Sequence, residues 1–290
     1  MILGFDDYEM QSRALAEVLD TSCEIVKMHR FPDGEDKLTL PPELPAHVVF
    51  CRSLDHPNSK LIELLLAAKT ARQLGAQELT LVAPYLCYMR QDKAFLPGEA
   101  ISQRIVGKLL ADLFENVITV DPHLHRIQYL QQAVPSKNAV TLSATSLMAA
   151  FVAELMTDPV LLGPDRESEQ WVASVAEPNN LAYGVCDKVR SGDRDIEITL
   201  PEIDLQGCNV VLVDDVASSG QTLAVAIREC ISRGARNVDV LITHALFAGD
   251  AIQRMQQAGV SKVWSTDSIS HESNVIPLKQ ILGDAVKCLA

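Results

Sequence analysis

Short apolar runs alternate with amphipathic stretches along the whole chain. The apolar runs have the length of buried strands and lie at 46–52, 78–84, 116–121, 159–165, 180–187, 208–215 and 237–247. In the stretches between them, apolar residues recur every three to four positions, as on one face of a helix. One such helix is predicted from Asn58 to Gly75, and others near 102–114, 220–233 and 249–258. Strands separated by helices predict parallel sheets with helices on both faces, and hence an α/β fold.

The two halves of the chain repeat the same pattern. The runs 117–121 and 210–214 both end on an aspartate that precedes a motif-rich turn. This repetition predicts two related α/β domains, 1–143 and 144–276, followed by an amphipathic helix at 277–290 that returns to cover the first domain. A chain of 290 residues is also near the size at which one core divides into two. No low-complexity linker separates the halves, which predicts a packed interface.

Composition and charge narrow the range of partners. The chain is 48% hydrophobic and 22% charged, as globular proteins are. Its 38 acidic and 25 basic side chains give a net charge of −13, which opposes general binding to nucleic acid or to an anionic membrane. No apolar run approaches the roughly 18 residues of a membrane-spanning helix, and the start of the chain lacks a basic signal-peptide segment. Seven dispersed cysteines without a CxxC pair fit a reducing compartment, so we expect a cytoplasmic protein.

The sharpest chemical motif is VVLVDDVASSGQTL at 210–223. A buried strand here delivers Asp214 and Asp215 to its carboxyl end, the edge at which open α/β sheets bind ligands. The two carboxylates suit the vicinal hydroxyls of a ribose. The turn that follows can aim backbone N–H groups and hydroxyls at one anion at a helix N-terminus, and its residues are Ser218, Ser219, Gly220, Gln221 and Thr222. An acidic helix cap is the simpler interpretation, but it leaves two repelling carboxylates beside a phosphate loop without a purpose.

This segment resembles the phosphoribosyl-binding loop of type I phosphoribosyltransferases and of ribose-phosphate pyrophosphokinases. Further motifs come in the order of the second family: RFPDGE (30–35), APYLCYMRQDKAFLPGEAI (83–101), VDPHLHRI (120–127), GPD (163–165), CDKVRSGD (186–193), THALF (243–247) and STDSI (265–269). The resemblance covers nearly the whole chain. The short length, the PGEA after RQDK and the DPHLHR are most similar to the archaeal-type branch of that family.

The resemblance implies two domains of the type I phosphoribosyltransferase fold, each a mainly parallel sheet flanked by helices. It implies a ribose-phosphate diphosphokinase that transfers the pyrophosphoryl group of MgATP to the anomeric hydroxyl of ribose 5-phosphate, in a site between the domains. The products would be AMP and 5-phosphoribosyl 1-pyrophosphate, a precursor in nucleotide biosynthesis. ATP and ribose 5-phosphate are then the partners and Mg²⁺ is the cofactor. The residues that would bind ribose 5-phosphate are Asp214, Asp215, Ser218, Ser219, Gly220 and Thr222.

Two turns in the first half are implied to bind ATP. Arg90 and Gln91 follow a predicted strand, and a guanidinium fork with an amide suits a polyphosphate chain. Phe31, Asp33 and Glu35 lie in a polar turn, where an aromatic face and carboxylates suit adenine and its amine. From the residues alone, this segment is only a turn signal. In the family it contacts the nucleotide of a neighbouring subunit, which implies a homo-oligomer with a dimer as its building unit.

The resemblance also assigns catalytic and metal-binding residues. His123 follows a strand end and is implied to be metal-linked or catalytic, and Asp165 matches an aspartate near Mg²⁺ and the ribose phosphate. Lys188 and Arg190 lie in a hydrophilic segment that can close over the site, exclude water and stabilise charge on the transferred group. A solvated basic turn is the simpler interpretation of that pair, and the family motif favours catalysis.

Two departures from the family pattern bear on ligand affinity. Arg166 and Glu167 stand where many relatives have a small or imidazole side chain followed by glycine. The phosphate loop has Ala217 and Gln221 where a larger aliphatic side chain and a glycine are frequent.

Two other functions stay open at this point. A phosphoribosyltransferase that consumes phosphoribosyl pyrophosphate would need only the second-half loop, and would leave the turns at 30–35 and 90–93 without a role. A non-catalytic relative that binds ribose phosphates or nucleotides and regulates a partner should have lost catalytic cations or an aspartate. Lys188, Arg190 and Asp215 are all present, which argues against this interpretation.

Overall fold

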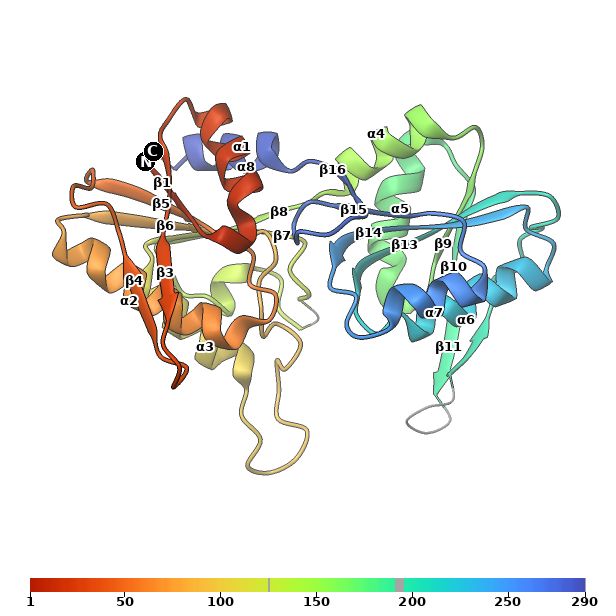
Figure 1. Ribbon diagram of the computed structural model, residues 1–290. Coiled ribbons are helices and arrows are strands. Elements are labelled where there is room, and N and C mark those ends of the chain that lie inside the picture. Colours follow the sequence, from red (N-terminus) through yellow and green to blue (C-terminus); the bar gives the residue numbers. More distant parts are fainter. Residues whose placement is uncertain (125, 191–195, 290) are drawn as a thin grey trace. The chain divides into compact units, whose positions relative to one another are not determined.

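The chain folds into two compact units. The computed structural model describes residues 1–124, 126–190 and 196–289. The first unit comprises Met1–Leu142 with Leu278–Ala290, and the second comprises Ser143–Pro277. Each unit is a parallel sheet flanked by helices, with a separate two-stranded ribbon (Figure 1), which confirms the predicted α/β class. In the described part of the chain, no helix is both long and apolar enough to span a membrane.

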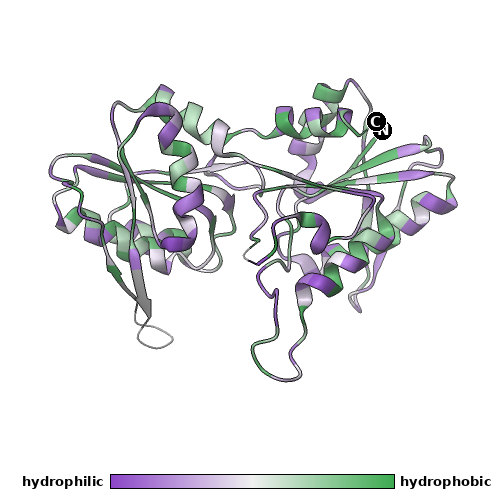
Figure 2. Ribbon diagram, turned by 180° about the vertical axis from the view of Figure 1, so that it is seen from behind, coloured by the Kyte–Doolittle hydropathy of each residue, from purple (hydrophilic) through white to green (hydrophobic). Residues whose placement is uncertain are grey.

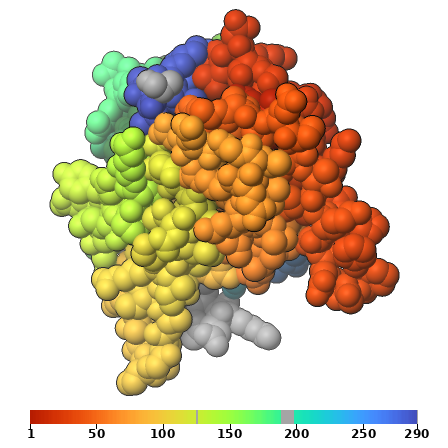
Figure 3. Space-filling model, turned by 90° about the vertical axis from the view of Figure 1, so that its left-hand side faces the viewer, coloured from red at the N-terminus to blue at the C-terminus, as the bar shows by residue number. Residues whose placement is uncertain are grey.

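The sheet of the first unit has the strand order β2-β1-β5-β6-β7-β8. Its strands are β1 (Ile2–Gly4), β2 (Cys23–Ile25), β5 (His47–Cys51), β6 (Glu78–Val82), β7 (Asn116–Val120) and β8 (Asn138–Leu142). Helices α1 (Glu9–Leu19) and α8 (Lys279–Lys287) cover one face, and α2 (Pro57–Gln73) and α3 (Ser102–Leu113) cover the other. Short 3-10 turns, Asp6–Tyr8 and Leu130–Gln132, complete the unit. An antiparallel ribbon of β3 (Lys27–Arg30) and β4 (Asp36–Thr39) and the loop before α3 both protrude from its surface (Figure 3).

The sheet of the second unit has the order β10-β9-β13-β14-β15-β16. Its strands are β9 (Val160–Gly163), β10 (Tyr183–Val185), β13 (Asn209–Ala217), β14 (Asn237–Ala245), β15 (Val263–Thr266) and β16 (Asn274–Ile276). The helices are α4 (Thr145–Leu155), α5 (Glu169–Ala176), α6 (Gln221–Ser232) and α7 (Ala251–Ala258), with 3-10 turns at Arg166–Ser168 and Glu177–Asn179. The ribbon consists of β11 (Asp187–Arg190) and β12 (Ile196–Thr199).

The strand predicted at 180–187 is in fact two strands. The chain leaves the parallel sheet after β10, and Cys186 donates its backbone N–H to Gly163 at 2.9 Å. β11 then pairs with β12 in the antiparallel ribbon. A continuous apolar pattern does not distinguish one strand from two that meet at a bend.

Buried apolar residues from both sides of each sheet form the cores. In the first unit, Leu3, Phe50 and Leu81 pack with the inner faces of α2 and α3. The Phe50 ring meets the edge of Phe114, with ring centroids 5.6 Å apart. In the second unit, alternate residues of β13 and β14 pack against α6 and α7. Hydrophobic residues accordingly follow the central strands in Figure 2.

In both sheets the order in which strands are added reverses at corresponding strands. In the first unit the chain passes from β1 to β2 on one side and later to β5 on the other side of β1. In the second unit it passes from β9 to β10 and later to β13 on the other side of β9. Ligands in open α/β sheets bind outside the carboxyl ends of the strands at such a reversal. The fold therefore provides one candidate position in each unit.

Candidate functional site

The reversal in the second unit carries the acidic loop. Asp214 and Asp215 lie near the end of β13, where Asp214 is partly exposed and Asp215 is 2% exposed. After Ser218 and Ser219, helix α6 begins at Gln221 with Gly220 as its N-cap. The backbone N–H groups at a helix N-terminus are a suitable cradle for a phosphate. The structure thus brings the predicted ribose hydroxyl acceptors and the predicted phosphate cradle together in one loop.

Gly220 has a backbone reason to be glycine. Its φ of +67° lies in the left-handed region, which side chains with a Cβ avoid. A Cβ at this position would also lie 3.0 Å from the backbone oxygen of Ala251. The loop is anchored to the segment after β14, because Phe247 and Ala248 donate their N–H groups to Ala217 and Ser218 at 2.9 and 3.0 Å. Gln221 lies inside α6, so its Cβ is accommodated in an ordinary helical conformation.

Three carboxyl groups act on one another at this reversal. Burial raises the pKa of Asp214 well above its usual range, and the charges of Asp215 and Asp165 raise that pKa further. Asp165 follows β9, the neighbour of β13, and its carboxylate accepts the N–H of Glu167 at 3.1 Å. A local concentration of negative charge favours a cation, and Mg²⁺ prefers carboxylate, water and phosphate oxygens. Among the described residues, no group of three or more His, Cys, Asp or Glu side chains is arranged to hold a metal ion. The carboxylates of Asp165 and Asp214 are of the kind that holds Mg²⁺, which is commonly bound through one or two carboxylates, water and substrate phosphates.

Lys188 and Arg190 occupy backbone positions two residues apart in β11. They pair with Ile198 and Ile196 of β12. The remainder of the CDKVRSGD motif, 191–193, lies outside the described residues. Arg166, one of the departures from the family pattern, donates from Nε to Asp187 at 2.6 Å. This hydrogen bond lowers the pKa of Asp187 and connects the turn after β9 to the start of the ribbon.

The turn predicted to contact adenine forms the tip of the β3–β4 ribbon. Phe31 is 40% exposed, and Asp33 and Glu35 are exposed. Phe31 donates its N–H to the backbone oxygen of Glu35 at 2.8 Å, and Asp33 accepts the N–H of Glu35 at 3.1 Å. The edge of the His29 ring contacts Phe31 at a centroid distance of 4.8 Å. The turn therefore presents an accessible aromatic face on an ordered backbone.

Arg90 and Gln91 lie in the loop between β6 and α3. Arg90 is exposed, and Gln91 donates from Nε2 to the backbone oxygen of Lys93 at 3.1 Å. The carboxylate of Glu99 organises this loop, because it accepts the N–H groups of Phe95 and Leu96 at 2.7 and 3.1 Å. These hydrogen bonds lower the pKa of Glu99.

His123 follows β7, the strand beside β6. It is half-buried, and Asp121 just before it is buried with a φ of +36°. Arg126 donates from Nη1 to the buried carboxylate of Asp92 at 2.5 Å. This ion pair joins the His123 segment to the loop of Arg90 and Gln91. Sequence reasoning missed the pair, although Asp92 lies within the RQDK motif and Arg126 within DPHLHR.

The predicted residues thus form four groups, one of which is the pair Lys188 and Arg190 in the β11–β12 ribbon of the second unit. The β13–α6 loop and Asp165 lie together in the second unit, and the loops that carry Arg90, Gln91 and His123 are joined in the first. The tip of the β3–β4 ribbon, which carries Phe31, is a separate element of the first unit.

The chain is similar to ribose-phosphate pyrophosphokinases along its whole length. Residues 1–113 match a family model described as the N-terminal domain of ribose phosphate pyrophosphokinase, and 141–279 match a phosphoribosyl transferase domain model. The ribose-phosphate pyrophosphokinase of Methanopyrus kandleri is 33% identical, over 100% of this chain and 99% of its own. Those of Saccharolobus solfataricus and Halobacterium salinarum are 33% and 32% identical, over 93% and 99% of this chain and 93% and 100% of their own.

A solved structure shows the same fold. The phosphoribosylpyrophosphate synthetase of Mycobacterium smegmatis superposes with a TM-score of 0.85, covering 100% of this chain and 98% of its own, at 20% sequence identity. The end-to-end match to relatives about a third identical in sequence, together with both family models, is decisive: the chain belongs to the ribose-phosphate pyrophosphokinase family.

Proposed function

We propose that this protein transfers the pyrophosphoryl group of ATP to the anomeric hydroxyl of ribose 5-phosphate, giving 5-phosphoribosyl 1-pyrophosphate and AMP. The observation that carries the proposal is the full-length match to ribose-phosphate pyrophosphokinases. The arrangement of both units supports it. The second unit has a loop suited to a ribose phosphate, and the first has cationic and aromatic turns suited to a nucleotide.

Ribose 5-phosphate is assigned to the β13–α6 loop. The 5-phosphate binds at the start of α6, to backbone N–H groups of Ser218, Ser219, Gly220 and Thr222 and to the hydroxyls of the two serines and the threonine. Asp214 and Asp215 accept hydrogen bonds from the ribose hydroxyls. A neutral sugar edge beside a bound dianion explains why one loop needs both carboxylates and phosphate donors.

ATP is assigned to the turns of the first unit. Phe31 stacks on adenine, and the carboxylates of Asp33 and Glu35 accept from its exocyclic amine. Arg90 and Gln91 hold the phosphate chain through a guanidinium fork and an amide. The exposed tip of the β3–β4 ribbon can reach a neighbouring copy of the chain, so we propose a homo-oligomer with a dimer as its building unit. We also propose a cytoplasmic location, because the dispersed cysteines fit a reducing compartment.

The chemistry is one displacement at the β-phosphorus of ATP. The anomeric oxygen forms a bond to that phosphorus and its hydroxyl proton passes to water, while the bond from the phosphorus to the α,β-bridging oxygen breaks and AMP leaves with the electron pair. Lys188 and Arg190 stabilise negative charge on the transferred group. His123 and Asp165 are the residues that would hold Mg²⁺, and His123 also acts near the reacting phosphates. When bound, Mg²⁺ neutralises charge on the phosphate oxygens and orients them.

A two-enzyme assay tests the proposal against the main alternative. The protein is incubated with ATP, Mg²⁺ and ribose 5-phosphate, and orotate phosphoribosyltransferase with orotate is then added. Consumption of orotate that requires both ATP and ribose 5-phosphate supports synthesis of phosphoribosyl pyrophosphate. A transferase that uses this compound would supply none of it, and orotate would remain.

A further inference from the structure

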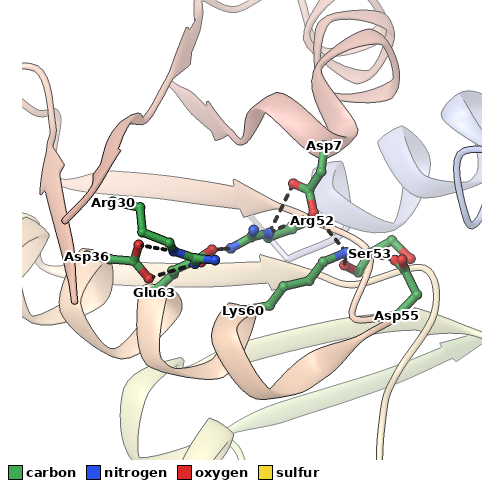
Figure 4. A network of polar contacts seen from close by, with 8 residues as sticks. All are labelled: Asp7, Arg30, Asp36, Arg52, Ser53, Asp55, Lys60 and Glu63. Carbon is green, nitrogen blue, oxygen red and sulfur yellow. Dashed lines mark hydrogen bonds and ion pairs between the residues drawn. The ribbon is translucent and has the colours of Figure 1, made fainter. Parts of the chain in front are cut away.

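A continuous chain of ion pairs fills the reversal of the first unit, between the carboxyl ends of β1 and β5 (Figure 4). Its cations come from β3, the end of β5 and α2, and its carboxylates come from the turns after β1 and β5, from β4 and from α2. The residues are Arg30, Arg52, Lys60, Asp7, Asp36, Asp55 and Glu63. Most of them line a cavity of about 420 Å³ together with Phe5 and Met28.

This position corresponds to the ribose-phosphate loop of the second unit. Gly4 pairs with Cys51 in the first sheet, and Leu162 pairs with Leu212 in the second. Aligning Gly4 with Gly163 and continuing both registers places Arg52 at the position of Asp214, and Ser53 at that of Asp215. The carboxylates that suit ribose hydroxyls are therefore missing here. The cationic side chain of Arg52 occupies the position that corresponds to Asp214.

Each cation of this chain already has carboxylate partners. Arg52 lies 3.1 Å from Asp7 and 2.5 Å from Glu63, and its guanidinium stacks on the Phe5 ring at 4.1 Å. Lys60 lies 2.8 Å from both Asp7 and Asp55 and donates to the backbone oxygen of Ser53 at 2.9 Å. An anion in this cavity would have to compete with these carboxylates. These ion pairs therefore fit a role in holding elements of the fold together better than a role as a second phosphate site.

At its Arg30 end, the ion-pair chain contacts the β3–β4 ribbon directly beside the turn at 31–35, which we assigned to ATP. Arg30 and Asp36 are register partners on the last rung of the ribbon and directly flank 31–35. The Arg30 guanidinium donates to both oxygens of Asp36 at 2.8 and 3.0 Å and to Glu63 of α2 at 3.2 Å. An isolated two-stranded ribbon is only marginally stable in water. The ion pair of Arg30 with Glu63 thus fixes the ribbon residues nearest the turn to helix α2.

We propose that Glu63 and Arg52 are positioning residues for the nucleotide turn at 31–35, acting through Arg30; this rests on the proposed function. Glu63 bridges Arg30 and Arg52, and the side chains of Glu63 and Arg52 are only 6% and 7% exposed. Removing one charge from a buried pair leaves its partner uncompensated. The Arg30 side chain would then lose its fixed anchor, and Phe31 would lose its fixed place relative to the sheet.

The test compares Glu63→Gln with a matched control. Glu115→Gln removes a carboxylate that pairs with Arg72, at the opposite end of α2, and that accepts the N–H of Leu79 at 2.8 Å. We expect Glu63→Gln to raise KM for ATP about tenfold, with kcat and KM for ribose 5-phosphate within about twofold of the parent. Backbone amides of 27–39 should exchange hydrogen faster than in the parent. In Glu115→Gln, KM for ATP and exchange in 27–39 should stay at the parent values.

Two features keep the test decisive. If Glu63→Gln fails to fold, Arg30→Gln replaces it, because the Arg30 side chain is 57% exposed and its loss disturbs no core. If the parent releases no AMP from ATP, the proposed function fails, and hydrogen exchange of 27–39 still tests whether the ion pairs hold the ribbon. Unchanged exchange in the variant, or equal increases of KM for both substrates, would overturn the proposal.

Discussion

Asp214 combines a cost in stability with the ribose-binding role proposed above. Burial and the charges of Asp215 and Asp165 raise its pKa, so its ionised form is disfavoured in the folded protein. Such conflicts are common where a protein is built to receive a ligand. A ribose with its hydroxyl donors, or a cation, relieves the conflict when it binds. The loop itself is anchored on the β14 side, where Phe247 and Ala248 donate their N–H groups to Ala217 and Ser218.

Replacing Asp215 should affect one substrate more than the other. We expect Asp215→Ala to raise KM for ribose 5-phosphate by about tenfold to a hundredfold, because it removes a charged hydrogen-bond acceptor. KM for ATP should change by no more than about twofold. Steady-state kinetics with each substrate varied in turn gives both values. Equal losses for the two substrates would indicate misfolding or a metal-binding role instead.

Lys188 should act on turnover. We expect Lys188→Ala to lower kcat by about a hundredfold to a thousandfold, with little change in KM for ATP, because its charge is used mainly in the transition state. Lys262→Ala is a suitable control, since Lys262 is an exposed lysine in the same unit. A parent-like kcat for Lys188→Ala would remove the catalytic assignment.

At the residue scale, the sequence could predict a group of residues only where they are neighbours in the chain. The segment from Asp214 to Thr222 was predicted as a strand end, a turn and a helix start, and the structure has these elements there; its ligand stays a prediction. The pair of Arg52 and Glu63 was not predicted, because each residue alone is typical of a solvated surface. Their partners come from β3 and from the turn after β1, and only the folded chain brings these together.

At the scale of elements, the start of α6 depends on the left-handed backbone of Gly220. Gly220→Ala should lower the free energy of unfolding by about 1–3 kcal/mol and raise KM for ribose 5-phosphate. Gly207→Ala is the matched control, because Gly207 has a similar φ of +73° but open space where a Cβ would lie. It should cost about 1 kcal/mol and leave KM unchanged. If both variants raise KM equally, the contact with Ala251 has no role in the loop.

The turn between β15 and β16 should make stability depend on pH. His271 accepts the N–H of Ser273 at Nδ1, at 3.1 Å, and burial lowers its pKa below 6.5. The unfolded chain therefore takes up the proton more readily, so this contribution is complete above about pH 6.5 and is lost as the pH falls. Denaturant unfolding across this range should show a smaller loss for His271→Asn than for the parent. Parallel curves for the two proteins would contradict the assignment.

Element prediction succeeded for long central strands and failed for short or polar ones. β5, β7 and β13 are nearly continuous apolar runs, and each was predicted close to its observed bounds. β1 and β2 have three residues each, too few for a periodic signal. Helix α2 begins at Pro57, one residue before the predicted start at Asn58. The Asn58 side chain accepts a hydrogen bond from the Tyr88 hydroxyl at 2.5 Å.

At the scale of the whole molecule, the two units share one topology but use their reversals differently. In the proposed function, the second unit binds its ligand at this position, whereas the first has ion pairs there that we propose position the nucleotide turn. The final helix α8 packs against α1 of the first unit. Gly283 permits this close approach, since a Cβ there would lie 2.4 Å from Cγ1 of Val18. One topology thus carries different residues at corresponding positions of the two units.

The most direct test of the central claim is phosphorus NMR of the products formed from ATP, Mg²⁺ and ribose 5-phosphate. The proposed mechanism predicts AMP only when the sugar is present, with an equal amount of a sugar that carries a pyrophosphate on its anomeric oxygen. ADP in place of AMP would mean that a single phosphoryl group moves, and would contradict the assignment of the reaction.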